Sequence, residues 1–149
     1  MQGLYFDEFS VGQKNISAAH TVTEDDILSF AELTGDHNRI HTDEKFAKGT
    51  PYGQRIAHGL LGLSTAIGLL MQTGMLEGSV IAFREIIEWK FIKPVFIGDS
   101  IHADVEVIHL KAMPRVGGGL VTIAMDVKNQ REETPMRGTL SVLVASKHG

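Results

Sequence analysis

The chain has 149 residues, 43% hydrophobic and 21% charged, which is the composition of one globular domain large enough to bury a core. It has no cysteine, so disulfide bonds, thiolate metal sites and a cysteine nucleophile are excluded. The formal net charge is -4 with histidines neutral, and the basic residues are scattered, which argues against nucleic acid as a partner.

The beginning of the chain has none of the basic and apolar character of a targeting signal, because Asp7 and Glu8 stand where an apolar segment would be needed. The longest apolar run, from Gly59 to Met71, is interrupted by two hydroxyl side chains and is too short to cross a bilayer. We therefore expect a soluble, cytoplasmic protein that does not bind membranes.

The first elements along the chain are a strand and a helix. Residues 14–22 favour an edge strand. Thr23 is an N-cap with Asp26 three residues on, and apolar residues then recur at helical spacing until Gly35. The pattern predicts a helix over about residues 24–34 that the glycine ends.

Residues 36–41 should form an ordered turn or loop after this helix, followed by a short capped helix that ends at Lys48. Residues 49–53 read as a loop. From residue 56 to residue 72 almost every position is apolar, which predicts a helix buried on all sides.

The second half of the chain favours strands, because four segments are rich in β-branched and apolar residues and are separated by Pro and Gly turn signals. These segments are residues 80–92, 99–111, 119–131 and 136–146. One long helix followed by antiparallel strands is an α+β arrangement in which the sheet curls around the helix. We expect a single domain over residues 1–149.

Asp36, Asn38 and His41 form the most reactive cluster in the sequence. Asp and Asn also favour turns after helices, so a purely structural role is the alternative. However, a carboxylate and an imidazole that share one water can remove a proton from it and return another to carbon. His37 and His41 are four residues apart, but Gly35 argues against a regular helix there and no metalloprotease glutamate lies between them, so we expect no metal.

His58 and Gly59 open the long apolar helix. A glycine at a helix start is common whatever the function. With a carbonyl oxygen bound there, the Gly59 N–H and the positive helix end would stabilise a developing enolate. Ser64, within GLSTA, fails the nucleophile-elbow pattern because Ala66 replaces its last glycine and the segment reads as helix, so it is at most a pocket-lining residue.

Residues 30–43, FAELTGDHNRIHTD, resemble the hydratase motif of the MaoC-like, (R)-specific enoyl-CoA hydratases. Residues 55–60, RIAHGL, match the segment that opens their central helix, and residues 91–99 resemble a strand and turn of the same family. The resemblance covers nearly the whole chain. It implies a hot-dog fold, a long helix wrapped by a curved antiparallel sheet, in a homodimer or higher homo-oligomer.

The resemblance also implies roles for individual residues. Asp36 and His41 would act on the catalytic water, Asn38 would position them, and the Gly59 N–H would bind the oxyanion. Ser64, His58 and Arg39 are candidates for substrate binding. Two positions depart from the family. Arg39 stands where many relatives have proline, and Ile67 stands near the place of a serine, so the resemblance does not define the polar side of the pocket.

We therefore expect reversible addition of water to a trans-2-enoyl thioester, giving an (R)-3-hydroxyacyl thioester. Coenzyme A is the favoured carrier and acyl carrier protein the alternative; no other cofactor is implied. A hot-dog acyl-CoA thioesterase and a non-catalytic acyl-thioester-binding subunit are the competing functions, because the fold does not separate them. Surface cations at Lys90, Lys93 and Arg55 are candidates to meet carrier phosphates.

Overall fold

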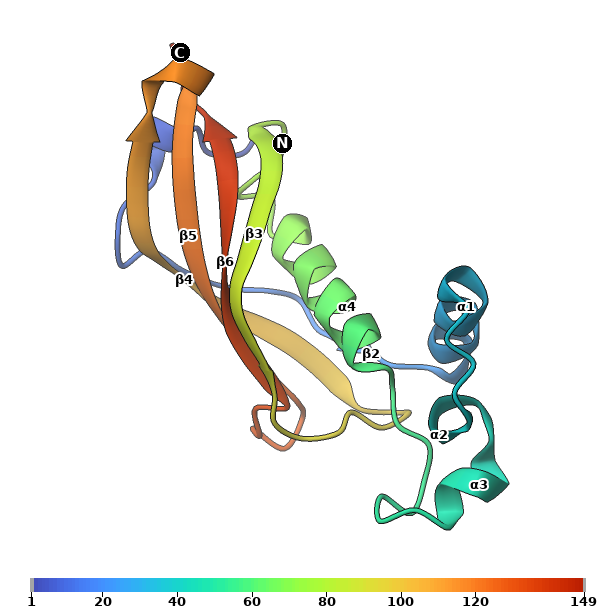
Figure 1. Ribbon diagram of the computed structural model, residues 1–149. Coiled ribbons are helices and arrows are strands. Elements are labelled where there is room, and N and C mark those ends of the chain that lie inside the picture. The colour runs from blue at the N-terminus through green and yellow to red at the C-terminus, as the bar shows by residue number, and fades with distance from the viewer. Residues whose placement is uncertain (1, 149) are drawn as a thin grey trace.

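The computed structural model describes residues 2–148 as one antiparallel sheet with four α-helices (Figure 1). The helices are α1 (Glu24–Thr34), α2 (Arg39–Thr42), α3 (Glu44–Lys48) and α4 (Gly59–Gln72), with 3₁₀ turns η1 (Phe6–Glu8) and η2 (Pro114–Val116). The strands are β1 (Lys14–Ile16), β2 (His20–Thr21), β3 (Val80–Phe91), β4 (Ser100–Met113), β5 (Gly118–Lys128) and β6 (Met136–Ala145). The expected α+β class is confirmed.

The sheet has the order β1-β4-β5-β6-β3, with β2 also paired to β4. The sequence predicts one edge strand over residues 14–22, whereas the structure has two short strands there. Ser17 interrupts the ladder, because its Oγ accepts the N–H of Ala103 at 2.8 Å in place of a backbone carbonyl. The four later strands agree with the predicted segments to within a few residues.

The core lies between the sheet and α4, which runs along one face of the curved sheet (Figure 1). Alternate residues of β4 are buried, and the inward side of α4 contributes Ala66, Leu69 and Leu70, each no more than 3% exposed. Such alternation is what a strand needs to bury one face. The sheet therefore holds α4, and with it the first residue of that helix, in a fixed position.

The outward face of α4 differs from the prediction of burial on all sides. Leu60 is 60% exposed and Ser64, one turn later, is also exposed. The Ser64 side chain lies on this face, and its expected role in lining a substrate pocket stays a prediction. Periodicity could not reveal the exposed face, since the helix carries apolar residues on every side.

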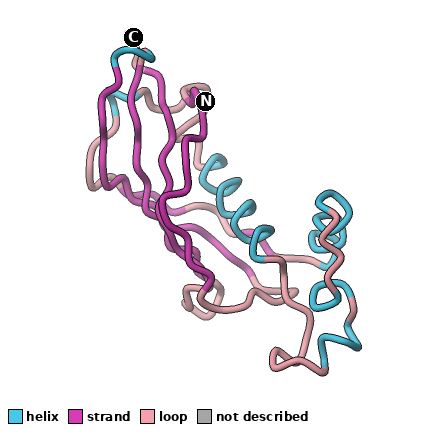
Figure 2. Tube along the Cα trace, viewed as in Figure 1, coloured by secondary structure: helices cyan, strands magenta, loops and turns pink. Residues whose placement is uncertain are grey.

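The segment from α1 to α3 extends to one side of the sheet, and Figure 2 shows it as a group of short helices joined by loops. Its first helix begins as predicted: Thr23 accepts the N–H of Asp26, and the Asp26 carboxylate accepts the N–H of Thr23. Within residues 2–148, no helix combines the length and apolar character required to cross a membrane.

Candidate active site

The turn after α1 is built by local hydrogen bonds. Gly35 adopts a left-handed conformation with φ 82° and ends the helix. The Asp36 carboxylate accepts the N–H of Asn38 at 3.2 Å, and the Asn38 side chain accepts the N–H of Ile40 at 3.2 Å. Asn38 thereby caps α2, the short helix that carries His41. The predicted turn is present, and its second half is helical.

His41 is held through one ring nitrogen. Its Nδ1 lies 2.8 Å from the carbonyl oxygen of Ile56, so Nδ1 carries the proton and Nε2 keeps its lone pair. Partial burial, together with the nearby imidazole of His58, lowers the pKa of His41, against the opposing effects of the Ile56 carbonyl and Asp36. The imidazole is therefore neutral at neutral pH, with a basic nitrogen free.

His58 contacts both Asp36 and His41. It is only 3% exposed, and its Nε2 donates to the backbone carbonyl of Asp36 at 3.0 Å. Its ring stacks on that of His41 with centroids 3.9 Å apart, and the Phe30 ring lies 4.9 Å away on a tilted plane. The sequence marked His58 as a candidate for substrate binding. In the structure this buried side chain lines the pocket and also contacts the His41 ring and the Asp36 backbone.

These residues converge on one pocket of about 230 Å³. Ligand atoms of Asp36, His41 and His58 lie within 4.8 Å of one another, which leaves room for a water bonded to two of them. The pocket is lined by Phe30, Thr34, Asp36, His41, His58, Gly59, Leu60 and Phe91. The two phenylalanines were missed by the sequence analysis, since no local pattern links α1 to the end of β3.

Gly59 is the first residue of α4, with His58 as its N-cap, so its N–H has no partner inside the helix. A Cβ at this position would lie 3.1 Å from the Phe91 ring, which is closer than ordinary van der Waals contact. Glycine therefore lets the aromatic ring approach the helix start. Gly59 lines the same pocket as Asp36 and His41.

Asp36, His41 and His58 are also potential metal ligands, since one ligand atom of each lies within 4.8 Å of the others. His41 and His58 each use one nitrogen on a backbone carbonyl. Each imidazole keeps its other ring nitrogen, and the Nδ1 of His58 is buried without a hydrogen-bond partner among residues 2–148. His37 is not part of the cluster and lies 3.7 Å from Glu32 on the surface.

Arg39 points away from the pocket. Its guanidinium lies over the Phe46 ring at 4.6 Å and 3.6 Å from the Asp43 carboxylate, and Arg39 is not among the residues that line the pocket, so its substrate-binding role stays a prediction. The other candidate cations are also paired with carboxylates: Lys90 with Glu88 at 3.6 Å, Lys93 with Glu133 at 2.8 Å and Arg55 with Glu24 at 2.9 Å.

A second pocket of about 320 Å³ adjoins the first and shares His58, Gly59 and Phe91 with it. Its other walls come from the segment before α4 and from residues 92–95, including Lys93. The start of α4 thus borders two neighbouring pockets. The smaller one contains Asp36 and His41, and the larger one includes Lys93.

The sequence matches the MaoC like domain over residues 8–134. The chain belongs to the MaoC-like domain family. The 3-hydroxybutyryl-CoA dehydratase of Methylorubrum extorquens is 40% identical over 109 residues, which cover 72% of this chain and 66% of that protein, less than two thirds of its length. The (R)-specific enoyl-CoA hydratase of Rhodospirillum rubrum is 36% identical over 71% of each chain. The predicted family is confirmed, and relatives in it are named as hydratases and dehydratases.

Solved structures agree with the fold. A protein from Archaeoglobus, described as a monoamine oxidase regulatory protein, superposes with a TM-score of 0.91 at 40% identity over 99% of this chain and 97% of its own. A Mycobacterium tuberculosis protein with a double hot-dog fold superposes with a TM-score of 0.84 at 22% identity, over 97% of this chain and 45% of that one. The predicted hot-dog fold is confirmed.

Proposed function

We propose that the protein catalyses reversible hydration of a trans-2-enoyl thioester to an (R)-3-hydroxyacyl thioester. The observation that carries this proposal is the meeting of the Asp36 carboxylate and the lone pair of His41 Nε2 in one pocket at the first residue of α4. Relatives named as hydratase and dehydratase support the same reaction.

The proposed reaction needs one water and two proton transfers. Asp36 removes a proton from water while the water oxygen bonds to the β carbon. The π electrons move toward the thioester oxygen, where the Gly59 N–H and the helix N-terminus stabilise the enolate. His41 holds the same water, and the proton that left this water is returned to the α carbon by the pair of Asp36 and His41. Atoms and charge balance without a metal or redox cofactor, so none is included in the proposal.

Coenzyme A is the carrier we propose. With the thioester oxygen at Gly59, the acyl group lies with Asp36 and His41, and the carrier extends into the adjoining pocket next to Lys93. We place the reaction in the cytoplasm, where the substrate would be available.

We also propose a homodimer, because β3 is an unpaired edge strand with exposed apolar side chains. Within residues 2–148, no strand pairs with its outer side. Five large apolar side chains on this strand are between 40% and 54% exposed: Ile81, Phe83, Ile86, Ile87 and Phe91. An apolar, unpaired edge of this length favours pairing with another chain. Light scattering should give twice the mass of one chain.

The decisive test is hydration of crotonyl-CoA, followed by the loss of enoyl absorbance. Positioned acid-base groups contribute about 10²–10⁴ in rate, so His41→Ala should lose turnover on that scale. His37→Ala is the matched control, because this histidine is four residues away on the surface and should keep wild-type turnover.

Near-normal turnover by His41→Ala would refute the assignment. A free-thiol assay run in parallel distinguishes hydration, which releases no thiol, from thioesterase activity. Saturable acyl-CoA binding without turnover at any chain length would instead identify a binding subunit.

A further inference from the structure

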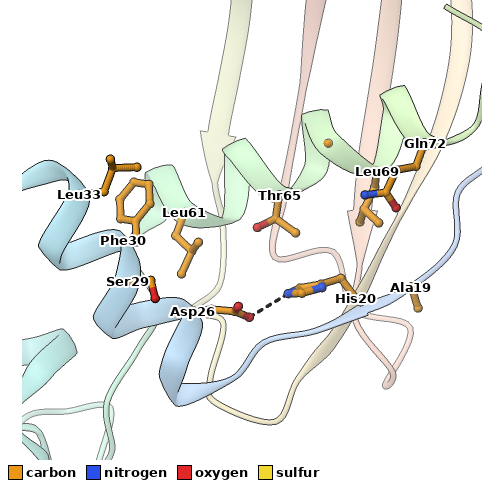
Figure 3. A pocket seen from close by; sticks show the side chains of 11 residues that line it. Ala19, His20, Asp26, Ser29, Phe30, Leu33, Leu61, Thr65, Leu69 and Gln72 are labelled. Atoms are coloured by element: carbon orange, nitrogen blue, oxygen red, sulfur yellow. Dashed lines mark hydrogen bonds and ion pairs between the residues drawn. The ribbon is translucent and has the colours of Figure 1, made fainter. Parts of the chain in front are cut away.

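A groove of about 420 Å³ runs between α1 and α4, outside the catalytic pocket (Figure 3). Its walls repeat at helical spacing on both helices: Asp26, Ser29, Phe30 and Leu33 on α1, and Leu61, Thr65, Gly68, Leu69 and Gln72 on α4, with Ala19 and His20 closing the far end. Residues three and four apart share one face of a helix, so these side chains form continuous walls.

The groove continues from the catalytic pocket. Phe30 lines both spaces. Leu60 and Thr34 line the catalytic pocket, whereas their neighbours Leu61 and Leu33 line the groove. An acyl chain that starts at the Gly59 N–H can therefore follow the seam between the helices past the Phe30 ring.

The near part of the groove is mostly apolar, and the far part carries polar groups among apolar ones. Near the catalytic pocket the walls are Phe30, Leu33 and Leu61, whereas the far part has the hydroxyl of Thr65 and the imidazole of His20 beside Ala19 and Leu69. Figure 3 shows Leu61 and Thr65 on the side of α4 that faces α1 and His20. An apolar chain fits the near part, but a methyl terminus would be a poor match for the far part.

The polar end is held in place by the Asp26 carboxylate. Its Oδ2 accepts from His20 Nε2 at 2.8 Å and from the Thr23 N–H at 3.0 Å. With the proton on Nε2, the Nδ1 of His20 is a free acceptor. Thr65 and Gln72 offer groups that both donate and accept. Three acidic residues in the first turn of α1 disfavour a carboxylate there. A neutral hydroxyl suits all of these groups.

We propose that this groove binds the distal part of the acyl group and selects chains that carry a hydroxyl near their far end. The axial rise from Gly59 to Thr65 is about 9 Å, which places that hydroxyl at the end of a medium-length chain. This inference rests on the proposed hydration reaction for its substrate, and it adds a second recognition point at Thr65 and His20.

The first experiment compares kcat/KM for octenoyl-CoA and its ω-hydroxy analogue. The wild type should prefer the hydroxylated substrate, and Thr65→Val should reduce the preference about fivefold, since one neutral hydrogen bond is lost. Thr21→Val is the matched control. It makes the same substitution on β2, next to His20 but at an exposed position outside the groove. Equal preference in the wild type and Thr65→Val would overturn the proposed selectivity.

The second experiment blocks the groove. A Cβ at Gly68 has no heavy atom within 4 Å, and Gly68 lines the groove, so the side chain of Gly68→Leu should enter this space. The kcat/KM ratio of octenoyl-CoA to crotonyl-CoA should fall at least about tenfold, because the long chain loses its apolar walls. Gly68→Ala should lower the ratio less. An unchanged ratio in a folded Gly68→Leu protein would overturn the acyl path.

The proposed hydration and the groove can fail separately. A wild-type protein that hydrates no enoyl-CoA refutes the reaction. The groove is then judged by calorimetry with the saturated thioester ω-hydroxyoctanoyl-CoA. Weaker binding to Gly68→Leu than to wild type supports the site, and equal affinities overturn it.

Discussion

The two ends of α1 each join an aspartate to a histidine, but in different ways. At the start of the helix, His20 bonds to the carboxylate of Asp26 at 2.8 Å. Beyond its end, His58 bonds to the backbone carbonyl of Asp36 at 3.0 Å, and within residues 2–148 the Asp36 carboxylate accepts only the N–H of Asn38. The same pair of residue types thus gives a fixed structural anchor at one end and a group available to water at the other. The difference is whether the histidine bonds to the carboxylate of the aspartate or to its backbone carbonyl.

The largest effect should come from removing the two carboxylates in turn. Asp36→Asn should reduce crotonyl-CoA hydration about 10²–10⁴-fold, because the amide cannot accept the water proton. Asp26→Asn should act mainly on stability and cost about 1 kcal/mol, since it weakens the helix cap and the bond to His20. Turnover assays and thermal melting of both variants measure the contrast. Equal loss of turnover would remove the distinction between the two ends.

A smaller effect should separate two glycines on α4. At Gly59 a Cβ would meet the Phe91 ring at 3.1 Å, so Gly59→Ala should reduce kcat about tenfold or more through displacement of the oxyanion donor. Gly68→Ala faces open space and should stabilise the helix by up to about 1 kcal/mol. Phe91→Leu should partly restore Gly59→Ala; if it gives no recovery, crowding by the ring is not the cause.

The pH dependence of activity and stability should differ between the residues at the two ends of α1. Burial keeps the pKa of His41 below its ordinary value of 6.5, so the acidic limb of kcat/KM should lie below that pH. As the pH falls, His41 is protonated in the unfolded chain before it is protonated in the folded protein. Its contribution to the free energy of unfolding is therefore lost as the pH falls below 6.5. A limb at or above 6.5 would contradict a neutral His41.

For Asp26, burial raises the pKa, but the bonds from Thr23 and His20 outweigh it and leave the pKa below 3.8. Its contribution to stability is therefore present above 3.8 and is lost only as pH falls further, through the folded-state pKa. Melting temperatures of wild type and Asp26→Asn should converge in that acidic range. A constant difference down to the lowest pH would show that the charge of Asp26 does not stabilise the helix start.

The smallest effect should follow from Arg39→Pro, which restores the residue common in the family. Arg39 is the first residue of α2 after the cap Asn38, a position that tolerates proline because its N–H has no helical partner. Loss of the exposed contacts with Asp43 and Phe46 should be offset by a stiffer turn, leaving stability within about 1 kcal/mol. A tenfold change in turnover would show that the arginine acts in the site.

Local elements could be predicted because their signals are contiguous. Thr23 and Gly35 marked both ends of α1, since a cap and a left-handed glycine act within one turn. The bond between His58 and the Asp36 carbonyl spans 22 residues and has no sequence signal. The exposed position of Ser64 could not be predicted for a related reason. An apolar helix has no polar face to set its rotation, so the side that faces α1 is defined only by packing.

The position of Phe91 links assembly to chemistry. This ring belongs to the exposed edge strand β3, and it also contacts the first residue of α4 beside the catalytic pocket. A second copy paired along β3 would restrict the ring that borders Gly59. Specific activity should then depend on protein concentration, falling on dilution as dimers separate, and the enzyme would work as a unit only above its dissociation constant.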